Sequence, residues 1–598
     1  MIAKATMILV AAVAVSPAAA DEHLSPLALA ASKDGRIVYV AAATAPKLLA
    51  VDLAAGKVVR QYPLPADATG AAVSPDGRTV YATCGLGEGQ LLAFDEQGAK
   101  RWAKPAGHSP MAPTSSPDGK TVYVCDRFNN RVLAISIADA NAAPRALAVS
   151  REPVAAAITS DGRKLVVANH LPAGAATATS SAVVSIIDTT TGKSAEVALP
   201  DGSTSLRGLC VSGDGAYAAV THILARHHLP TTQLDRGWMN TNALSVIDLA
   251  GGTLVNTVLL DDLDRGAANP WGIAWSADGK QICVAHAGTH ELSVIDAPAM
   301  LAKLAEAAKA GPARQAEVRN DLAFLAGIRR RVAIMGVGPR GLVFAGSKIV
   351  AAEYFSDTLA VLEPVATGAK AASIALGSQS KESPQRRGER LFNDAMGCFQ
   401  NWQSCATCHP DVRADALNWD LLNDGYGNPK NTRSLLLTHQ VAPVMISGVR
   451  AKSADAVRAG IRHIQMTGMD EDAVAALEAY LRSLAPVPSP RLVGGKLSES
   501  AARGEKLFES TGCASCHSGA LGTDSQPHDI GLTDAKGPTK FYTTKLTEVW
   551  RTAPYLFDGR AATMTDVLTK FNPNDKHGAT SKLSKQQLDD LTEYVLSR

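Results

Sequence analysis

Two short motifs combine the residue types that attach haem covalently. They are Cys405-Ala406-Thr407-Cys408-His409 and Cys513-Ala514-Ser515-Cys516-His517. Two thiols at this spacing can form thioethers to the two vinyl groups of one haem, and the adjacent histidine can then ligate the iron. A zinc site would need two such pairs close together, whereas these lie far apart in the chain. The sequence therefore predicts two covalently bound haems c, with His409 and His517 as proximal iron ligands.

The distal ligand of each iron is less constrained. When the two C-terminal segments are aligned on an aspartate that both contain, Met466 falls opposite His577, and both precede the last helix of their segment. His577 is the candidate distal ligand of the second haem. Met466 and His463 compete for the first haem, with Met445 behind them. Methionine would raise the reduction potential and a second histidine would lower it. The alternative is that these side chains only line the haem crevices.

The sequence around the two motifs is duplicated. Arg-Gly-Glu-Arg-Leu-Phe at 387–392 precedes the first motif, and Arg-Gly-Glu-Lys-Leu-Phe at 503–508 precedes the second. Apolar periodic segments at 477–484 and 591–597 close the two segments, as the C-terminal helix of a cytochrome c domain would. We therefore expect two all-α cytochrome c domains at residues 388–486 and 487–598, with the proline-rich stretch 486–490 at their boundary.

The region 385–598 resembles the bacterial dihaem cytochrome c peroxidase family, which includes the dihaem enzyme of methylamine utilisation. The haem motifs and the segments Gly427–Leu435 and Thr552–Arg560 carry the resemblance. It implies two haems close enough to exchange electrons, one of them often open to peroxide. It also implies a tryptophan route between the haems, for which Trp402, Trp419 and Trp550 are candidates. Aromatic packing around the macrocycles is the alternative role of these tryptophans.

The chain departs from that family's pattern at the distal positions. Phe557 stands where the family commonly has histidine, and Phe571 lies near the usual place of a methionine or tyrosine ligand. No family-like Glu/Gln pair follows Val449-Arg450. These departures bear on peroxidase activity more than on haem attachment.

A repeat extends from residue 24 to about residue 376. Each copy has a Ser-x-Asp-Gly turn, whose Asp-Gly pair favours a hairpin, and then two β-rich runs. The turns begin at Ser32, Ser74, Ser116, Ser160 (one residue shorter), Ser212 and Ser276, and a degenerate seventh lies at 344–347. Seven copies predict a seven-bladed β-propeller over residues 21–376, and the repeats resemble the YVTN-type family. Insertions at 171–182, 223–242 and 297–331, the last of helical composition, interrupt it, and 377–387 reads as a linker.

One position per repeat, where the first β-run ends, is often polar and would form a ring at one face of the propeller. It carries Asp126, Asn169 with His170 next to it, His222, His286 and Glu353. An imidazole-rich ring would suit copper or another metal. The alternative is that this position is polar because it faces the water-filled mouth of the tunnel.

The bulk properties exclude some functions and indicate a compartment. The formal net charge of +2 and the absence of a basic run give no case for a nucleic-acid partner. Residues 1–20 have a positive n-region, a short apolar stretch and an Ala-Ala-Ala cleavage site, as in a signal peptide, which predicts a periplasmic protein. No later segment has the roughly 20 consecutive apolar residues that a membrane span needs.

Three functions are consistent with this organisation. The first is a peroxidase- or oxidase-like dihaem enzyme whose propeller docks a substrate or partner. The second is a non-catalytic electron carrier that uses the propeller as a binding platform. The third is a metal-dependent oxidoreductase with its site on the propeller face and the haems as electron relay. The expected partner is a small redox protein, a cytochrome or cupredoxin, or a small-molecule oxidant or reductant.

Overall fold

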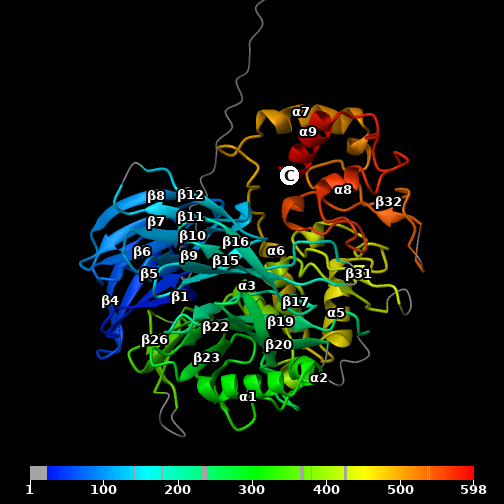
Figure 1. Ribbon diagram of the computed structural model, residues 1–598. Helices are drawn as coiled ribbons and strands as arrows, with labels where there is room; N and C mark the ends of the chain where they lie inside the picture. Colours follow the sequence, from blue (N-terminus) through cyan, green and yellow to red (C-terminus); the bar gives the residue numbers. More distant parts are fainter. Residues whose placement is uncertain are drawn as a thin grey trace, which may run out of the picture.

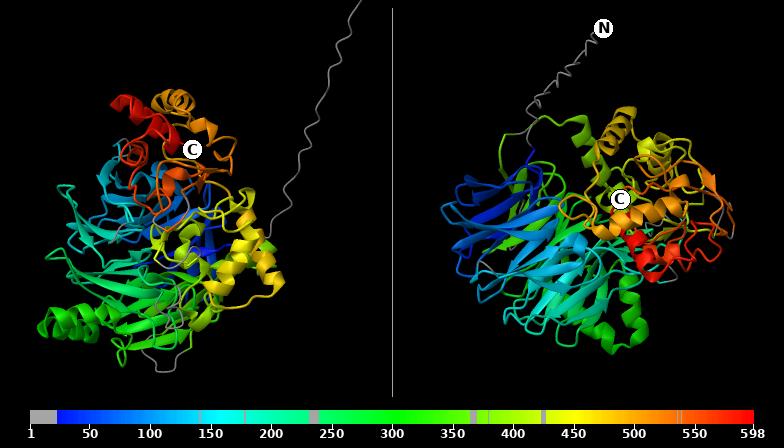
Figure 2. Two further views of the ribbon diagram at one scale, coloured as in Figure 1. Left: turned by 90° about the vertical axis from the view of Figure 1, so that its right-hand side faces the viewer. Right: turned by 90° about the horizontal axis from the view of Figure 1, so that it is seen from above.

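The computed structural model describes residues 23–139, 142–176, 179–230, 239–363, 370–378, 380–422, 427–534, 536–537 and 539–598. The predicted signal peptide at 1–20 therefore lies outside the described residues. Within them, a ring of antiparallel sheets is followed by a helical region that sits on one side of the ring (Figures 1 and 2). None of the helices in the described ranges has the length and hydrophobicity needed to cross a bilayer.

Seven sheets form the predicted propeller, and each is an antiparallel meander. The first three blades are β1 (Pro26–Ala31), β2 (Ile37–Ala42), β3 (Lys47–Asp52), β4 (Lys57–Pro63); β5 (Ala68–Val73), β6 (Thr79–Cys84), β7 (Glu88–Asp95), β8 (Lys100–His108); and β9 (Pro110–Ser115), β10 (Thr121–Asp126), β11 (Arg131–Ser136), β12 (Arg145–Ala148). The fourth and fifth are β13 (Pro153–Ile158), β14 (Lys164–Asn169), β15 (Val183–Asp188), β16 (Ser194–Ala198); and β17 (Ser203–Thr204), β18 (Leu209–Val211), β19 (Tyr217–Ala225), β20 (Asn240–Asp248), β21 (Thr253–Leu259). The last two are β22 (Pro270–Trp275), β23 (Gln281–His286), β24 (Glu291–Asp296), β25 (Arg329–Ala333); and β26 (Pro339–Ala345), β27 (Lys348–Glu353), β28 (Thr358–Leu362), β29 (Ala372–Ala375).

The ring closes because the inner strand of the seventh blade packs directly on that of the first. A Cβ atom added at Gly341 of β26 would lie 2.6 Å from the carbonyl oxygen of Leu27 in β1. The sixth and seventh blades approach each other in the same way, since a Cβ at Gly272 of β22 would lie 2.2 Å from the carbonyl oxygen of Arg340 in β26. Only glycine allows backbones this close. Closure of this kind removes exposed edges at the centre of the fold.

The Ser-x-Asp-Gly turns form the hairpins that the sequence predicts. In the second blade, Ser74 Oγ donates to Asp76 Oδ1 at 2.5 Å and accepts from the backbone N–H of Thr79 at 2.9 Å. The sequence suggested that the fourth turn is one residue shorter, but the structure shows a turn of full length. Thr159 takes the place of the serine, and its Oγ1 donates to Asp161 Oδ1 at 2.6 Å. A threonine hydroxyl can make the same local bonds as serine.

The insertion 297–331 is helical over residues 297–320, as expected, but its last residues, 329–331, belong to strand β25. It contains α1 (Ala297–Lys309), α2 (Pro312–Glu317) and a 3-10 turn (Val318–Asn320). Met300 and Leu304 of α1 are buried against the fifth and sixth blades, in a cluster that includes Val258 and Ile295. This insertion therefore extends the core of the propeller away from the helical region.

The helical region consists of two units with the same plan. Unit 1 (residues 384–488) contains α3 (Pro384–Asn393), α4 (Cys405–Cys408), α5 (Ser453–His463), α6 (Glu471–Ser483) and the hairpin β30 (Asn418–Trp419)–β31 (Lys430–Asn431). Unit 2 (residues 489–598) contains α7 (Glu499–Ser510), α8 (Met564–Leu568), α9 (Lys585–Leu596) and the hairpin β32 (Pro527–His528)–β33 (Phe541–Tyr542). Because α3 begins at Pro384 after the cap Ser383, the predicted linker 377–387 ends earlier than expected.

The first and last helices of each unit cross at matched glycines. A Cβ atom at Gly388 of α3 would lie 1.9 Å from the carbonyl oxygen of Ala476 in α6. The corresponding distance from Gly504 of α7 to Asp590 in α9 is 2.0 Å. These are the two helix pairs that the duplicated sequence predicts, and the backbones touch in both.

Both units lie on one face of the propeller, here called the docking face (Figure 2). The inner strands begin at this face, because Arg151, Arg207 and Asn269, which bond to the units, precede β13, β18 and β22. Direct hydrogen bonds connect the two parts. Asn269 Nδ2 donates to Ser404 Oγ at 2.8 Å, and Asn240 Nδ2 donates to Gln403 Oε1 at 2.7 Å. The insertion 171–182 reaches unit 2, where Ala176 N donates to the carbonyl oxygen of Gly559 at 2.9 Å.

Candidate functional site

The histidines of the two Cys-x-x-Cys-His motifs are oriented as iron ligands require. His409 Nδ1 donates to the carbonyl oxygen of Arg413 at 3.0 Å, and His517 Nδ1 donates to that of Gly522 at 3.0 Å. These bonds place the ring proton on Nδ1 and leave the Nε2 lone pair for a metal. Burial lowers the pKa of both imidazoles, which favours the neutral form that binds iron.

The motif thiols are available for thioether bonds. None of the nine cysteines, all of which are described, takes part in a disulfide. Cys405 and Cys408 lie at the two ends of the single turn α4, and Cys513 begins the 3-10 turn Cys513–Ser515. The two residue pairs therefore have the chemistry that covalent haem attachment needs.

His577 faces His517 across a gap that fits an iron atom. The ring centres are 6.2 Å apart with an interplanar angle of 33°. A metal held by two imidazole nitrogens at about 2 Å each would separate ring centres by roughly 6 Å. Burial, and then the neighbouring His517, lower the pKa of His577 to about 4, and its Nδ1 is buried without a hydrogen-bond partner. The residues present at this site fit a haem ligated on both sides.

The loop that carries His577 is held in place by Asn572. Asn572 Oδ1 accepts from the backbone N–H of His577 at 2.9 Å, and its Nδ2 donates to the carbonyl oxygen of Gly578 at 2.7 Å. A Cβ atom at Gly578 would lie 3.0 Å from Cys513 Sγ, so this loop packs on a haem-binding thiol. The position of His577 is therefore built into the fold of unit 2.

Unit 1 has no matching arrangement. Met466 is 43% exposed, and His463 is an exposed residue at the end of α5. In the described part of the chain, no imidazole faces His409 as His577 faces His517. The reason is chain length, because residues 569–584 separate α8 from α9, whereas only residues 464–470 separate α5 from α6. The shorter connection bonds to the chain just before the motif, where Gln403 Nε2 donates to the carbonyl oxygen of Ile464 at 2.8 Å. Among the described residues, no hydrogen bond or ring contact joins Met466 or His463 to His409.

The polar ring expected on the propeller does not converge. Each side chain bonds near its own strand end or to the neighbouring blade: His222 Nε2 to Ser245 Oγ at 2.8 Å, His286 Nε2 to Ser293 Oγ at 2.8 Å, His170 Nδ1 to Leu206 O at 2.9 Å, Asp126 Oδ2 to Arg131 Nε at 2.6 Å, and Glu353 Oε1 to Gly336 N at 2.7 Å. Burial lowers the pKa of His222 to about 4 and of His286 to about 3. Strand ends of different blades are spread around the tunnel, so the structure does not bring the five together as one ligand set.

Two smaller groups of ligand atoms do come together among the described residues. Asp201, His227 and His228 have ligand atoms within 4.8 Å of one another, and His228 Nε2 lies 2.8 Å from Asp201 Oδ2. The second group is Cys516, Asp524 and His528. It includes a thiol that the haem motif uses.

The tryptophans proposed as an electron route lie at different places. The ring of Trp550 packs edge-on against Phe128, at 5.0 Å, and against His108, at 6.0 Å, both in the propeller. Trp402 and Trp419 are buried in unit 1, 1% and 4% exposed. The structure therefore places Trp550 at the junction with the propeller.

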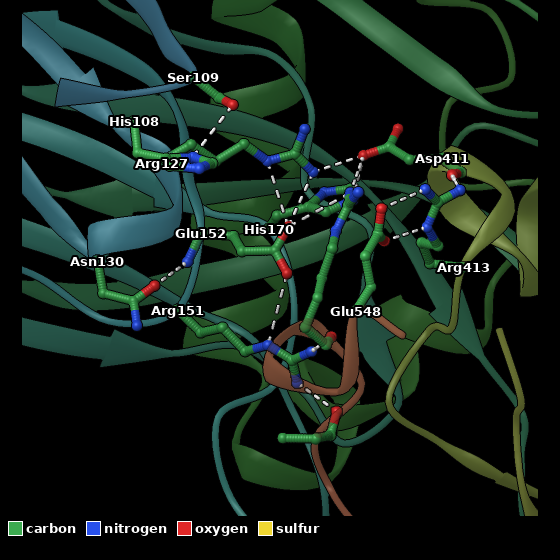
Figure 3. A network of polar contacts seen from close by, with 12 residues as sticks. His108, Ser109, Arg127, Asn130, Arg151, Glu152, His170, Asp411, Arg413 and Glu548 are labelled. Carbon is green, nitrogen blue, oxygen red and sulfur yellow. Dashed lines mark hydrogen bonds and ion pairs between the residues drawn. The ribbon is translucent and has the colours of Figure 1, made fainter. Parts of the chain in front are cut away.

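A buried network of charges joins the propeller to both units (Figure 3). Asp411, two residues after His409, accepts from Arg207 Nη2 at 2.9 Å and from Arg551 Nη2 at 2.9 Å. Arg127 also bonds to Asp411 and reaches Glu152 Oε2 at 2.8 Å. Arg127, Arg207 and Glu152 belong to the propeller, Asp411 to unit 1 and Arg551 to unit 2. The first haem motif is thus anchored directly on the docking face.

A second buried ion pair joins the two units to each other. Arg413 Nε donates to Glu548 Oε2 at 2.6 Å, and Nη2 donates to Oε1 at 2.8 Å. Arg413 is 6% and Glu548 1% exposed. The backbone oxygen of Arg413 also accepts the hydrogen bond from His409 Nδ1, so this pair fixes the carbonyl that orients a candidate haem ligand. Sequence reasoning missed Asp411, Arg413 and Glu548, and the only signal for the first two was their position just after the motif.

Comparisons with known proteins support the two-part organisation. Residues 14–228 match a family model described as outer membrane protein assembly factor BamB, and residues 501–598 match the cytochrome c family. The chain is 28% identical over 332 residues to hydrazine synthase subunit gamma of Kuenenia stuttgartiensis, covering 45% of this chain and 94% of that protein. It is 28% identical over 181 residues to hydrazine synthase subunit beta of the same organism, covering 30% of this chain and 46% of that protein.

A solved structure has a related fold. A chain of Kuenenia stuttgartiensis hydrazine synthase aligns with a TM-score of 0.53 at 24% identity, covering 60% of this chain and all of that one. The chain is therefore a seven-bladed propeller joined to a helical cytochrome c domain, and it resembles subunits of hydrazine synthase. A cytochrome c domain implies a covalently bound haem c.

Proposed function

We propose that the protein is an exported redox enzyme with two haems c that play different roles. His517 and His577 would hold the haem of unit 2 between them, and a haem held in this way would serve as an electron relay. His409 would hold the haem of unit 1, which would be free to bind a small molecule. The observation that carries the proposal is the facing pair of imidazoles in unit 2, 6.2 Å apart, which unit 1 lacks among its described residues.

The residues of the chain orient the haem ligands and connect them. A haem bound at each motif would supply an iron that changes oxidation state. The carbonyls of Arg413 and Gly522 keep the two proximal imidazoles in one tautomer. The backbone of Arg433 lies beside His409 and that of Thr544 beside His517, and Arg433 Nη2 donates to Thr544 Oγ1 at 2.8 Å. This short bonded path supports electron exchange between the units.

The proposed substrate class is a small inorganic nitrogen compound, because both curated relatives are subunits of hydrazine synthase. The match covers nearly all of subunit gamma and about half of subunit beta. That this chain takes part in the reaction of a whole complex is therefore also a proposal. An open iron would also fit peroxidase- or oxidase-like chemistry, which is the second candidate. In either case we propose a periplasmic protein that exchanges electrons with a small cytochrome or cupredoxin.

Carbon monoxide binding tests the proposal, because the gas binds reduced haem iron only where an axial position is open. We expect two haems per chain by pyridine haemochrome and one carbon monoxide bound per chain. The His577→Ala variant should bind two molecules of carbon monoxide per chain. The matched variant His528→Ala, which removes another histidine of unit 2, should still bind one. An unaltered protein that binds none would be an electron carrier with two closed haems.

A further inference from the structure

Three neighbouring blades present large side chains at the centre of the docking face. Arg207, Trp271 and Arg340 each precede a glycine at the start of an inner strand. In β22, Pro270 pairs with His286 and Ile273 with Val284, so two residues oppose one and the strand bulges. β26 has the same bulge at Arg340. A bulge re-aims its side chain, and here it does so at Trp271 and Arg340, at the start of two inner strands on the docking face.

These side chains stack in alternation with aromatic rings. The guanidinium carbons of Arg207 and Arg340 lie 4.1 and 4.4 Å from the centre of the Trp271 ring. Arg340 also lies 3.5 Å from the Tyr354 ring, and Arg386 of unit 1 lies 5.0 Å from that ring. Stacking leaves the edges of a guanidinium free for hydrogen bonds. The row thus offers several N–H donors at one place.

Arg340 differs from the other arginines of the row because it lacks an anionic partner. Arg207 is paired with Asp411 at 2.9 Å, and Arg386 with Glu389 at 2.9 Å. Arg340 is only 8% exposed, its Nε is buried without a hydrogen-bond partner, and no ion pair to it is found in the described ranges. A buried unpaired charge is costly unless something neutralises it.

The surroundings do not supply the missing negative charge. The nearby carboxylates already have cationic partners: Asp411 is paired with Arg207 and Arg551, Glu152 with Arg127, and Glu389 with Arg386. The unpaired charge of Arg340 would attract an anion into this enclosed position.

We infer that the mouth of the propeller tunnel is an anion site in which Arg340 binds a carboxylate or a small planar oxyanion. The anion has two sources, a free ion that enters from solution or a carboxylate of the haem held by unit 1. In both cases the guanidinium of Arg340 offers two parallel N–H donors to two oxygen atoms. The stacked rings of Trp271 and Tyr354 hold that guanidinium in place.

Calorimetric titration with sodium nitrate tests the first source, using the haem-loaded full chain at constant ionic strength. We expect saturable binding at one site that weakens at least tenfold in Arg340→Gln and less in Arg340→Lys, which keeps the charge but loses the paired donors. Arg78→Gln, which removes an exposed arginine outside the row, should bind like the unaltered protein. If Arg340→Gln does not fold, bromide soaked into crystals of the unaltered protein should give an anomalous peak beside Arg340.

A redox titration distinguishes the second source. If the haem carboxylate occupies the site, nitrate should not bind. The reduction potential of one haem should then fall in Arg340→Gln and stay unchanged in Arg340→Lys, because a lost cation favours the oxidised iron. The inference is overturned if nitrate does not bind, no bromide peak appears beside Arg340, and the potentials are the same in all variants.

Discussion

At the scale of single residues, buried charges hold the haem ligands to the rest of the molecule. Arg413 and Glu548 form a bidentate pair between the two units, and Asp411 bonds to arginines of both the propeller and unit 2. Such pairs gain little over apolar packing, but breaking one leaves an uncompensated charge. Their main contribution is therefore to the placement of His409 and its neighbours.

Glu548→Gln should destabilise the protein strongly. The change leaves Arg413 charged and buried, which costs about 3–5 kcal/mol. Chemical denaturation measures the loss. Asp589→Asn is the matched control, because it breaks the exposed pair with Lys585 and should change stability by no more than about 0.5 kcal/mol. Equal effects of the two variants would contradict the role given to the buried pair.

Glu152 should make stability depend on acid. Burial alone would raise its pKa, but the charges of Arg127, Arg551 and Arg151 outweigh burial, with a smaller effect from His170, and lower it from 4.5 to about 2. The folded state therefore gains about 3 kcal/mol above pH 4.5, lost as the pH falls toward 2. In Glu152→Gln this part of the acid dependence should disappear. Denaturation curves for both proteins from pH 5 to 2 measure it, and identical slopes would contradict it.

At the scale of elements, the two helix pairs of the units depend on close backbone contact. The packing of α7 on α9 at Gly504 has the same geometry as that of α3 on α6 at Gly388. Each pair packs beside one of the two Cys-x-x-Cys-His segments, so we expect its spacing to affect how well a haem is held.

Gly504→Ala should force α7 and α9 apart, since its Cβ would meet the Asp590 carbonyl oxygen at 2.0 Å. Overpacking of this kind costs about 1–3 kcal/mol. The melting temperature and the haem content per chain are the readouts, and both should fall. Gly460→Ala is the control, because Gly460 lies in α5 with open space around it, and alanine there should stabilise the helix by up to about 1 kcal/mol. An unchanged melting temperature in Gly504→Ala would count against the close packing.

Local patterns made most of the elements predictable. The Ser-x-Asp-Gly turns predicted the blades because their bonds span only about five residues. The duplicated Arg-Gly-Glu segments predicted the helix pairs. The distal side of unit 1 was not predictable, because Met466 and His577 align in sequence while the lengths of the connections after α5 and α8 decide where they lie. The bonding of the polar ring was not predictable either, because periodicity does not tell whether a side chain turns to its own blade or to the neighbouring one.

At the scale of the whole molecule, the propeller is a platform for both units. Arg151 of the propeller donates to the carbonyl oxygens of Arg551 and Ala553 in unit 2, at 2.8 and 2.7 Å. Arg127 and Arg207 hold unit 1 through Asp411. The same face therefore fixes the relative position of the two haem motifs.

Arg151→Met should loosen unit 2 from the propeller. Two carbonyls of unit 2 would lose their donor, so hydrogen exchange of residues 549–556 should speed up and calorimetry should resolve a separate transition. Arg163→Met, at an exposed arginine of the same blade, should leave the exchange unchanged. A variant whose exchange rates match those of the unaltered protein would show that Arg151 does not hold the junction.

The central claim is that one iron is closed by two histidines and the other is open. Low-temperature EPR of the fully oxidised haem-loaded protein tests it most directly. We predict one low-spin and one high-spin ferric signal of equal intensity, with the low-spin signal converted to high-spin in His577→Ala. Two low-spin signals in the unaltered protein, or a low-spin signal that survives in His577→Ala, would contradict the account.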